Sequence, residues 1–131
     1  MTTVLMCLLV AFLLNMLSKV PVAVAMSRRP GGYDNHHPRD QQAALAGWGR
    51  RALAAHQNQF EAFPAFGVGV LAALLAGATG TWLDALAVVF VVARVLYIAL
   101  YIADLHLLRS MVWAVGFVAT AGLYVLAAQA L

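Results

Sequence analysis

Four polar side chains stand on one predicted helix face within an otherwise apolar run between residues 83 and 105. Arg94, Tyr97, Tyr101 and Asp104 follow one another at i, i+3, i+7 and i+10, so a helix places all four on the same side. Their neighbours are mostly Val, Ala, Leu and Ile, and such a polar face cannot point at lipid. An unpaired arginine near the centre of a membrane span costs at least about 2.5 kcal/mol. The pattern therefore indicates a polar partner for Arg94 inside the protein.

Asn58 and Glu61 supply that partner on the preceding apolar run. Glu61 comes ten residues after Arg51, about 15 Å along a helix that leaves the cytoplasm. Arg94 precedes His106 by twelve residues, about 18 Å along a helix that returns there. We therefore predict an ion pair between Glu61 and Arg94. Spacing leaves two interpretations equally open: the pair only fixes helix register, or it also forms the floor of a polar cavity.

The composition shows which elements must position these residues. Of the 131 residues, 64% are hydrophobic and 10% are charged, against roughly 25% charged in a soluble domain. Four apolar runs reach the roughly 20 residues that a membrane span needs. We predict an all-α membrane protein, a four-helix bundle that forms a single domain over residues 1–131, with a polar loop over 26–49. The predicted helices are Thr3 to Ala25, Ala52 to Ala76 with a kink at Pro64, Leu83 to Leu105, and Met111 to Leu131.

The basic residues indicate the orientation in the membrane. The connection from Gly77 to Trp82 has no Lys or Arg, whereas basic residues gather in or beside the first connection and in the third. The positive-inside rule places both basic connections in the cytoplasm and both termini outside. The net charge is +3, but the basic residues form no soluble face, so nucleic acid is not a predicted partner. The basic residues concerned are Arg28, Arg29, Arg39, Arg50, Arg51 and Arg109.

The polar loop contains Asp34, His36, His37 and Asp40, which are all metal-ligand types. Adjacent histidines followed by proline lack the spacing of recognised zinc sites, so we predict no metal site. An ordered loop that caps a site or touches phospholipid head groups is the preferred interpretation. Cys7 is the only cysteine, so no internal disulfide can form.

The segment Ala55-His56-Gln57-Asn58-Gln59-Phe60-Glu61-Ala62-Phe63-Pro64-Ala65-Phe66, together with Arg94, Tyr97 and Tyr101, resembles the MAPEG family. These are membrane-associated proteins of eicosanoid and glutathione metabolism, and the resemblance covers nearly the whole chain. It implies a homotrimer that binds glutathione as a co-substrate in clefts between neighbouring subunits, open to the cytoplasmic side.

The resemblance also implies roles for individual residues. Asn58 and Glu61 match family positions that bind the glutathione backbone. Arg94 matches the arginine of the third helix, and Tyr97 and Tyr101 match positions that face the tripeptide.

Arg109, in the short predicted connection from His106 to Ser110, is similar in placement to the arginine that lowers the thiol pKa in leukotriene and prostaglandin synthases. On its own, an arginine at a membrane interface is most often a topology anchor. Ala54 departs from the family pattern, because well-studied members carry an arginine there, and Arg51 lies close to one helical turn away as a substitute. The polar loop resembles bacterial members, which implies a bacterial inner membrane.

Two functions follow from this comparison. The first is a glutathione-dependent transferase or peroxidase acting on hydrophobic electrophiles, in which Arg109 favours the nucleophilic thiolate. In that case Arg51, Asn58, Glu61, Arg94, Tyr97 and Tyr101 hold the tripeptide. The second is a non-catalytic membrane scaffold that binds a lipid or a small anionic ligand, which the Ala54 departure favours.

Overall fold

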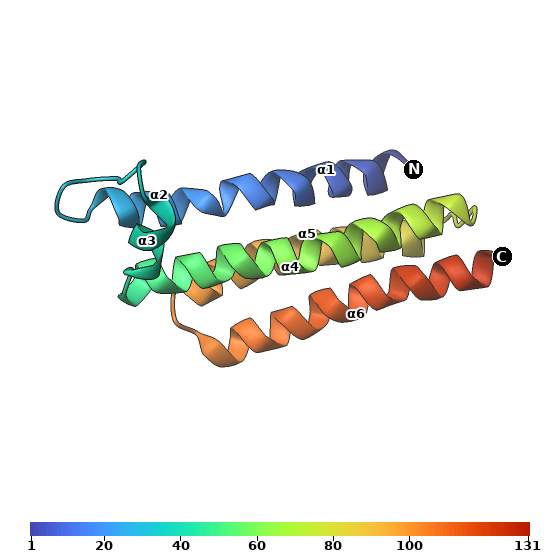
Figure 1. Cartoon of the computed structure of the whole chain (residues 1–131). Coiled ribbons are helices and arrows are strands. Elements are labelled where there is room, and N and C mark those ends of the chain that lie inside the picture. Colours follow the sequence, from blue (N-terminus) through green and yellow to red (C-terminus); the bar gives the residue numbers. More distant parts are fainter.

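The computed structural model describes all residues from 1 to 131 and contains helices but no strands. Four helical segments run side by side (Figure 1) and are long and apolar enough to cross a membrane. The protein is thus an all-helical integral membrane protein in contact with lipid. The helices are α1 (Thr2–Leu17), α2 (Lys19–Ser27), α3 (Pro38–Ala43), α4 (Gly47–Leu75), α5 (Thr81–Ile102) and α6 (His106–Ala130).

Helices α1 and α2 form one span, because Ser18 between them keeps a helical backbone with φ −64° and ψ −17°. The short α3 lies in the first connection, next to the start of α4. Both termini lie at one end of the bundle with the α4–α5 connection, and the α3 loop lies at the other end with the α5–α6 connection (Figure 1). This up-and-down course brings the basic connections to the same end.

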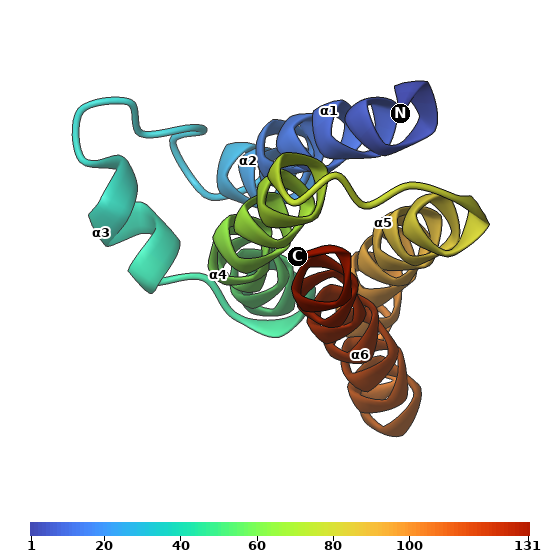
Figure 2. The same ribbon diagram turned by 90° about the vertical axis from the view of Figure 1, so that its right-hand side faces the viewer.

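Helices α4 and α5 form the middle of the bundle. Seen along the bundle, α1 packs on one side of this pair and α6 on the other (Figure 2). The rings of Phe66 and Phe90 stack between α4 and α5, with centroids 3.9 Å apart and planes 4° from parallel. Both side chains are fully or almost fully buried. This contact fixes α4 against α5 near the residues that carry the polar groups.

Small residues allow the helices to approach one another closely. A Cβ added to Gly69 of α4 would lie 3.0 Å from the Tyr124 ring of α6, and one added to Gly49 would lie 2.8 Å from the Cβ of Ala25 in α2. Close backbone approach through small residues is the usual way that helices associate in membranes. Helix α4 runs through Pro64 without interruption.

The spans begin and end up to five residues from the predicted boundaries, and the ends of α4 and α5 show a clear cause. After α4, Gly77 has φ +80°, and the N–H of Ala78 donates to the Ala73 carbonyl at 2.9 Å. After α5, Asp104 has φ +64°, and the N–H of Leu105 donates to the Leu100 carbonyl at 3.0 Å. Both are left-handed helix terminations of the Schellman type, for which Gly and occasionally Asp are suited.

These ends correct two predictions. Asp104 lies beyond the end of α5 and therefore does not share the helix face of Arg94 and Tyr97. The segment from His106 to Ser110 is not a connection but the first turn of α6. Arg109 is consequently fixed on a helix rather than in a loop.

Candidate functional site

Arg94 of α5 is held by two side chains of α4. Its Nε donates to Gln59 Oε1 at 2.8 Å, and its Nη2 donates to Asn58 Oδ1 at 2.9 Å. Only 2% of Arg94 is exposed, and Gln59 is fully buried. Gln59 Nε2 also donates to the carbonyl of Ala11 at 3.3 Å, so Gln59 links α1, α4 and α5. A buried guanidinium needs such partners, and here they are neutral amides.

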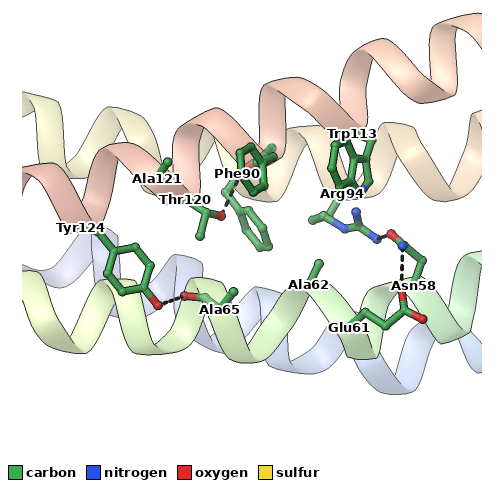
Figure 3. Close-up of a pocket in the computed structure, with 12 residues that line it drawn as sticks. Asn58, Glu61, Ala62, Ala65, Phe90, Arg94, Trp113, Thr120, Ala121 and Tyr124 are labelled. Carbon is green, nitrogen blue, oxygen red and sulfur yellow. Dashed lines mark hydrogen bonds between the residues drawn. The ribbon is translucent and has the colours of Figure 1, made fainter.

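Glu61 reaches Arg94 only through Asn58. Asn58 Nδ2 donates to Glu61 Oε2 at 3.0 Å, while its Oδ1 accepts from Arg94 (Figure 3). Glu61 and Arg94 lie at the same level along the bundle, as predicted, but the predicted direct ion pair is wrong. The reason is helix geometry: Asn58 and Gln59 present their amides to α5, whereas the Glu61 carboxylate is left exposed beside them.

A series of ring contacts extends from Arg94 towards Arg109. The Arg94 guanidinium lies over the Tyr97 ring, 4.3 Å from its centroid, and Tyr97 meets Tyr101 edge to face at 5.6 Å. The Arg109 guanidinium lies 4.3 Å from the centroid of Tyr101. Cation–π contacts of this kind position a guanidinium without consuming all of its hydrogen-bond donors. Together with Asn58 and Glu61, these residues form one continuous row of contacts.

Two neighbouring cavities open along this row. The larger, of about 460 Å³, lies between α4, α5 and α6, with Asn58, Glu61 and Arg94 on its polar side. The smaller, of about 240 Å³, is lined by Tyr97, Tyr101, Arg109, Ser110 and Trp113. Trp113 borders both. The remaining lining of the larger cavity is Ala62, Ala65, Phe90, Trp113, Gly116, Phe117, Thr120, Ala121 and Tyr124.

Arg51 lies apart from these cavities. Its Nε donates to the carbonyl of Ile102 at 3.0 Å, at the end of α5. Ala54 lines a third cavity, of about 250 Å³, together with Arg39 and Arg50. Within one chain, Arg51 is therefore the one candidate site residue that borders neither of the two cavities.

Sequence reasoning missed the contribution of α6. Trp113, Gly116, Phe117, Thr120 and Tyr124 line the larger cavity, although no site residue was predicted between Met111 and Leu131. The Tyr124 hydroxyl donates to the carbonyl of Ala65 at 2.9 Å (Figure 3). The signal was the helical spacing of these residues, at i, i+3, i+4, i+7 and i+11, which puts them on one face. Gln59 was also missed, although it lies inside the quoted motif.

The first loop is held by side-chain to backbone hydrogen bonds. Asp34 Oδ1 accepts from the N–H groups of His36 and His37, both at 2.9 Å. Gln41 accepts from the Asp34 N–H at 2.9 Å and donates to the Gly32 carbonyl at 2.8 Å. The hydrogen bond from the His37 backbone, with that from His36, lowers the pKa of Asp34 below its ordinary value of 3.8. No three side chains of His, Cys, Asp or Glu converge as metal ligands.

The comparison with protein families agrees with this architecture. The site and fold define a four-span membrane protein with a polar row between α4, α5 and α6. A model of the MAPEG family matches residues 3–129, so the chain belongs to the MAPEG family. Comparisons with curated proteins and with solved structures found no match.

Proposed function

We propose that this protein is a membrane-bound glutathione-dependent transferase or peroxidase that acts on hydrophobic electrophiles. The observation that carries the proposal is the hydrogen-bonded group of Arg94, Asn58 and Glu61 at the polar side of an apolar cavity. Membership of the MAPEG family is consistent with this activity. Glutathione serves as a co-substrate.

The charges of the row complement those of glutathione. Its single ammonium group fits the exposed carboxylate of Glu61, which accepts one hydrogen bond within the chain, from Asn58. One of its carboxylates fits Arg94, whose Nη1 makes no hydrogen bond within the chain. The hydroxyls of Tyr97 and Tyr101 are also without partners in the chain and are available for the peptide groups. Because Asn58 and Gln59 already fix the guanidinium, binding requires little reordering of Arg94.

Arg51 remains a candidate for the second carboxylate. Only its Nε is engaged, by the carbonyl of Ile102, so both terminal nitrogens of its guanidinium are available.

Arg109 is the proposed thiol-activating residue. A guanidinium keeps its positive charge at all physiological pH values, so it stabilises a thiolate placed beside it. In the transferase reaction the thiolate sulfur forms a bond to carbon while the leaving group departs with its electron pair. In the peroxidase reaction the thiolate sulfur takes the terminal peroxide oxygen as the O–O bond breaks, and the remaining alkoxide takes up a proton and leaves as the alcohol. The thiol of a second glutathione then attacks the resulting sulfenic acid, which gives the disulfide and water.

The walls of the larger cavity suit an apolar second substrate. Ala62, Ala65, Phe90 and Phe117 supply apolar surface next to the polar row. A hydrophobic electrophile dissolved in the bilayer can enter such a cavity at little cost, because it exchanges one apolar environment for another.

The exposed carboxylate of Glu61 also supports the proposed homotrimer. Glu61 lies within a membrane span, where an ionised side chain facing lipid is costly. A neighbouring subunit over this face would turn the open side of the cavity into a cleft between subunits. We further propose that the protein lies in a bacterial inner membrane, with the α3 loop in the cytoplasm and both termini outside.

The alternative proposal is a non-catalytic scaffold that binds a lipid or a small anionic ligand in the cleft. Ala54 favours it, because this position supplies no cation to a glutathione carboxylate. A lipid that stays bound in the cleft when glutathione is added would support the scaffold, whereas ready displacement by glutathione would oppose it.

Calorimetric titration of glutathione into the detergent-solubilised protein tests the binding step. We expect saturable binding by the parent protein and none by Arg94→Ala. Absence of saturable binding by the parent would overturn the proposed function.

Ultraviolet absorbance of the bound thiolate tests the activation step. Arg109→Gln should lower the thiolate signal at saturating glutathione. Arg29→Gln is the matched control, because Arg29 is exposed and its guanidinium has no hydrogen-bond partner. Equal thiolate signals in Arg109→Gln and the parent would remove Arg109 from the proposed mechanism.

A further inference from the structure

A third cavity, separate from the row described above, opens between α3 and α4. It has a volume of about 250 Å³ and shares no lining residue with the other two. Its lining residues belong to α3 and the first part of α4. These elements lie at the end of the bundle that carries the basic loop (Figure 1). Its lining contains two arginines and no carboxylate. The lining residues are Arg39, Gln42, Ala43, Arg50, Leu53, Ala54 and Gln57.

Gln42 is the residue that points to a ligand in this cavity. Only 5% of Gln42 is exposed, yet its side-chain amide makes no hydrogen bond within the chain. The amide itself is not sealed from the cavity, because the only buried side-chain oxygens or nitrogens without a partner belong to Asn15 and Asp84. The free amide N–H groups of Gln42 can therefore donate to an acceptor oxygen of a ligand in the cavity.

The two arginines define the charge of that group. Arg50 Nη1 donates to the carbonyl of Ala43 at 3.1 Å, which holds its guanidinium at the rim of the cavity. Arg39 is exposed and its guanidinium makes no hydrogen bond within the chain. Like charges gathered without a carboxylate are unfavourable, and an anion between them removes the repulsion.

We propose that this cavity binds the phosphate of an anionic phospholipid head group. Guanidinium groups match the geometry of phosphate oxygens, and Gln42 adds a neutral donor. Basic pockets beside membrane helices are suited to lipid head groups, and the start of a span is where lipid phosphates lie. The site would seat a lipid beside α4 at the entrance to the bundle.

Native mass spectrometry of the detergent-solubilised protein, titrated with phosphatidylglycerol or phosphatidylcholine, tests this proposal. We expect preferential retention of phosphatidylglycerol. The double variant Arg39→Gln/Arg50→Gln should retain it roughly 10-fold to 100-fold more weakly, because the phosphate loses its charge-assisted hydrogen bonds to the two guanidinium groups. The matched control is Arg28→Gln/Arg29→Gln, which removes the same charge at the same end but outside the cavity. Equal losses in the two double variants would overturn the proposal.

Gln42→Leu separates a ligand role from a structural one. Because the amide has no partner in the protein, leucine should leave thermal stability unchanged or raise it while weakening lipid retention. A loss of stability with unchanged retention would contradict the proposal.

Soluble glycerol phosphate distinguishes a lipid from a free phosphate compound. If it fails to displace phosphatidylglycerol, the lipid assignment stands. If it binds as tightly as the lipid, the cavity is a site for free phosphate and the lipid assignment is overturned. Adding glutathione tests whether the lipid site is separate from the proposed glutathione site. Displacement of the lipid by glutathione would contradict a separate lipid site.

Discussion

Arg94 and Glu61 lie at one depth in the bundle but are joined through the amide of Asn58, which accepts from Arg94 at 2.9 Å and donates to Glu61 at 3.0 Å. The arrangement keeps the arginine buried and leaves the carboxylate exposed. Neither charge is neutralised by direct contact with the other, so both are available to a ligand that carries an ammonium and a carboxylate.

The first prediction concerns Gln59. Gln59→Leu should lower the free energy of unfolding by about 1–3 kcal/mol, because it leaves the buried Nε of Arg94 without an acceptor. Unfolding in mixed detergent micelles measures the change. Gln57→Leu is the control, since Gln57 is exposed on the same helix and has no hydrogen-bond partner. Equal stability of the two variants would show that the Gln59 bond does not hold Arg94.

The second prediction concerns the close contact between α2 and α4. Gly49→Ala should destabilise the protein by about 1–3 kcal/mol, because the new Cβ would lie 2.8 Å from the Cβ of Ala25. Gly67→Ala in the same helix should be neutral or stabilising by up to about 1 kcal/mol. A Cβ added to Gly67 meets only the Cδ1 of Leu8, at an ordinary contact distance of 3.7 Å.

A double variant provides the check on this contact. Adding Ala25→Gly to Gly49→Ala should restore much of the lost stability, because it removes the colliding Cβ. Strictly additive losses in the double variant would mean that the contact is not the cause.

The third prediction concerns the pH dependence of the first loop. The pKa of Asp34 is lower in the folded loop than in the unfolded chain, so its stabilising effect is fully present above the ordinary value of 3.8. The effect is lost as the pH falls through the lowered pKa. Hydrogen exchange of the His36 and His37 amides, corrected for intrinsic rates, should therefore show protection that declines in that acidic range.

Two variants test the assignment to Asp34. Asp34→Asn keeps an oxygen acceptor without the titration, so the protection should no longer depend on pH. Asp40→Asn should behave as the parent protein does, because the Asp40 side chain makes no hydrogen bond. A retained acid transition in Asp34→Asn would exclude Asp34 as its source.

The sequence was sufficient for the all-helical membrane class, the four spans and the shared depth of Glu61 and Arg94, since these follow from hydropathy and helix rise. It could not supply the direct contacts of Arg94. Gln59 and Asn58 are adjacent in sequence, and only the rotation of α4 against α5 decides that both amides, rather than Glu61, meet the guanidinium.

The positions of the helix ends could not be predicted from the sequence either. The termination of α5 depends on the left-handed conformation of Asp104, a residue that hydropathy alone assigns to the apolar run. Hydropathy does not mark the start of α6 either, so Arg109 was assigned to a connection, although it lies in the first turn of α6. The contribution of Trp113 and Tyr124 was available as a helical stripe, but aromatic stripes most often indicate packing, so the stripe alone does not predict a cavity wall.

The most direct test of the proposed site is the calorimetric affinity for glutathione of Glu61→Gln compared with Asp104→Asn. Glutamine keeps the shape of Glu61 and can still accept from Asn58, so only the charge offered to the ammonium is lost. We predict roughly 10-fold to 100-fold weaker binding for Glu61→Gln, since a hydrogen bond to a charged group contributes about 1.5–3 kcal/mol. Asp104→Asn, at an exposed position with φ +64° that asparagine tolerates, should bind as the parent does. Unchanged affinity in Glu61→Gln, or an equal loss in both variants, would contradict the proposed site.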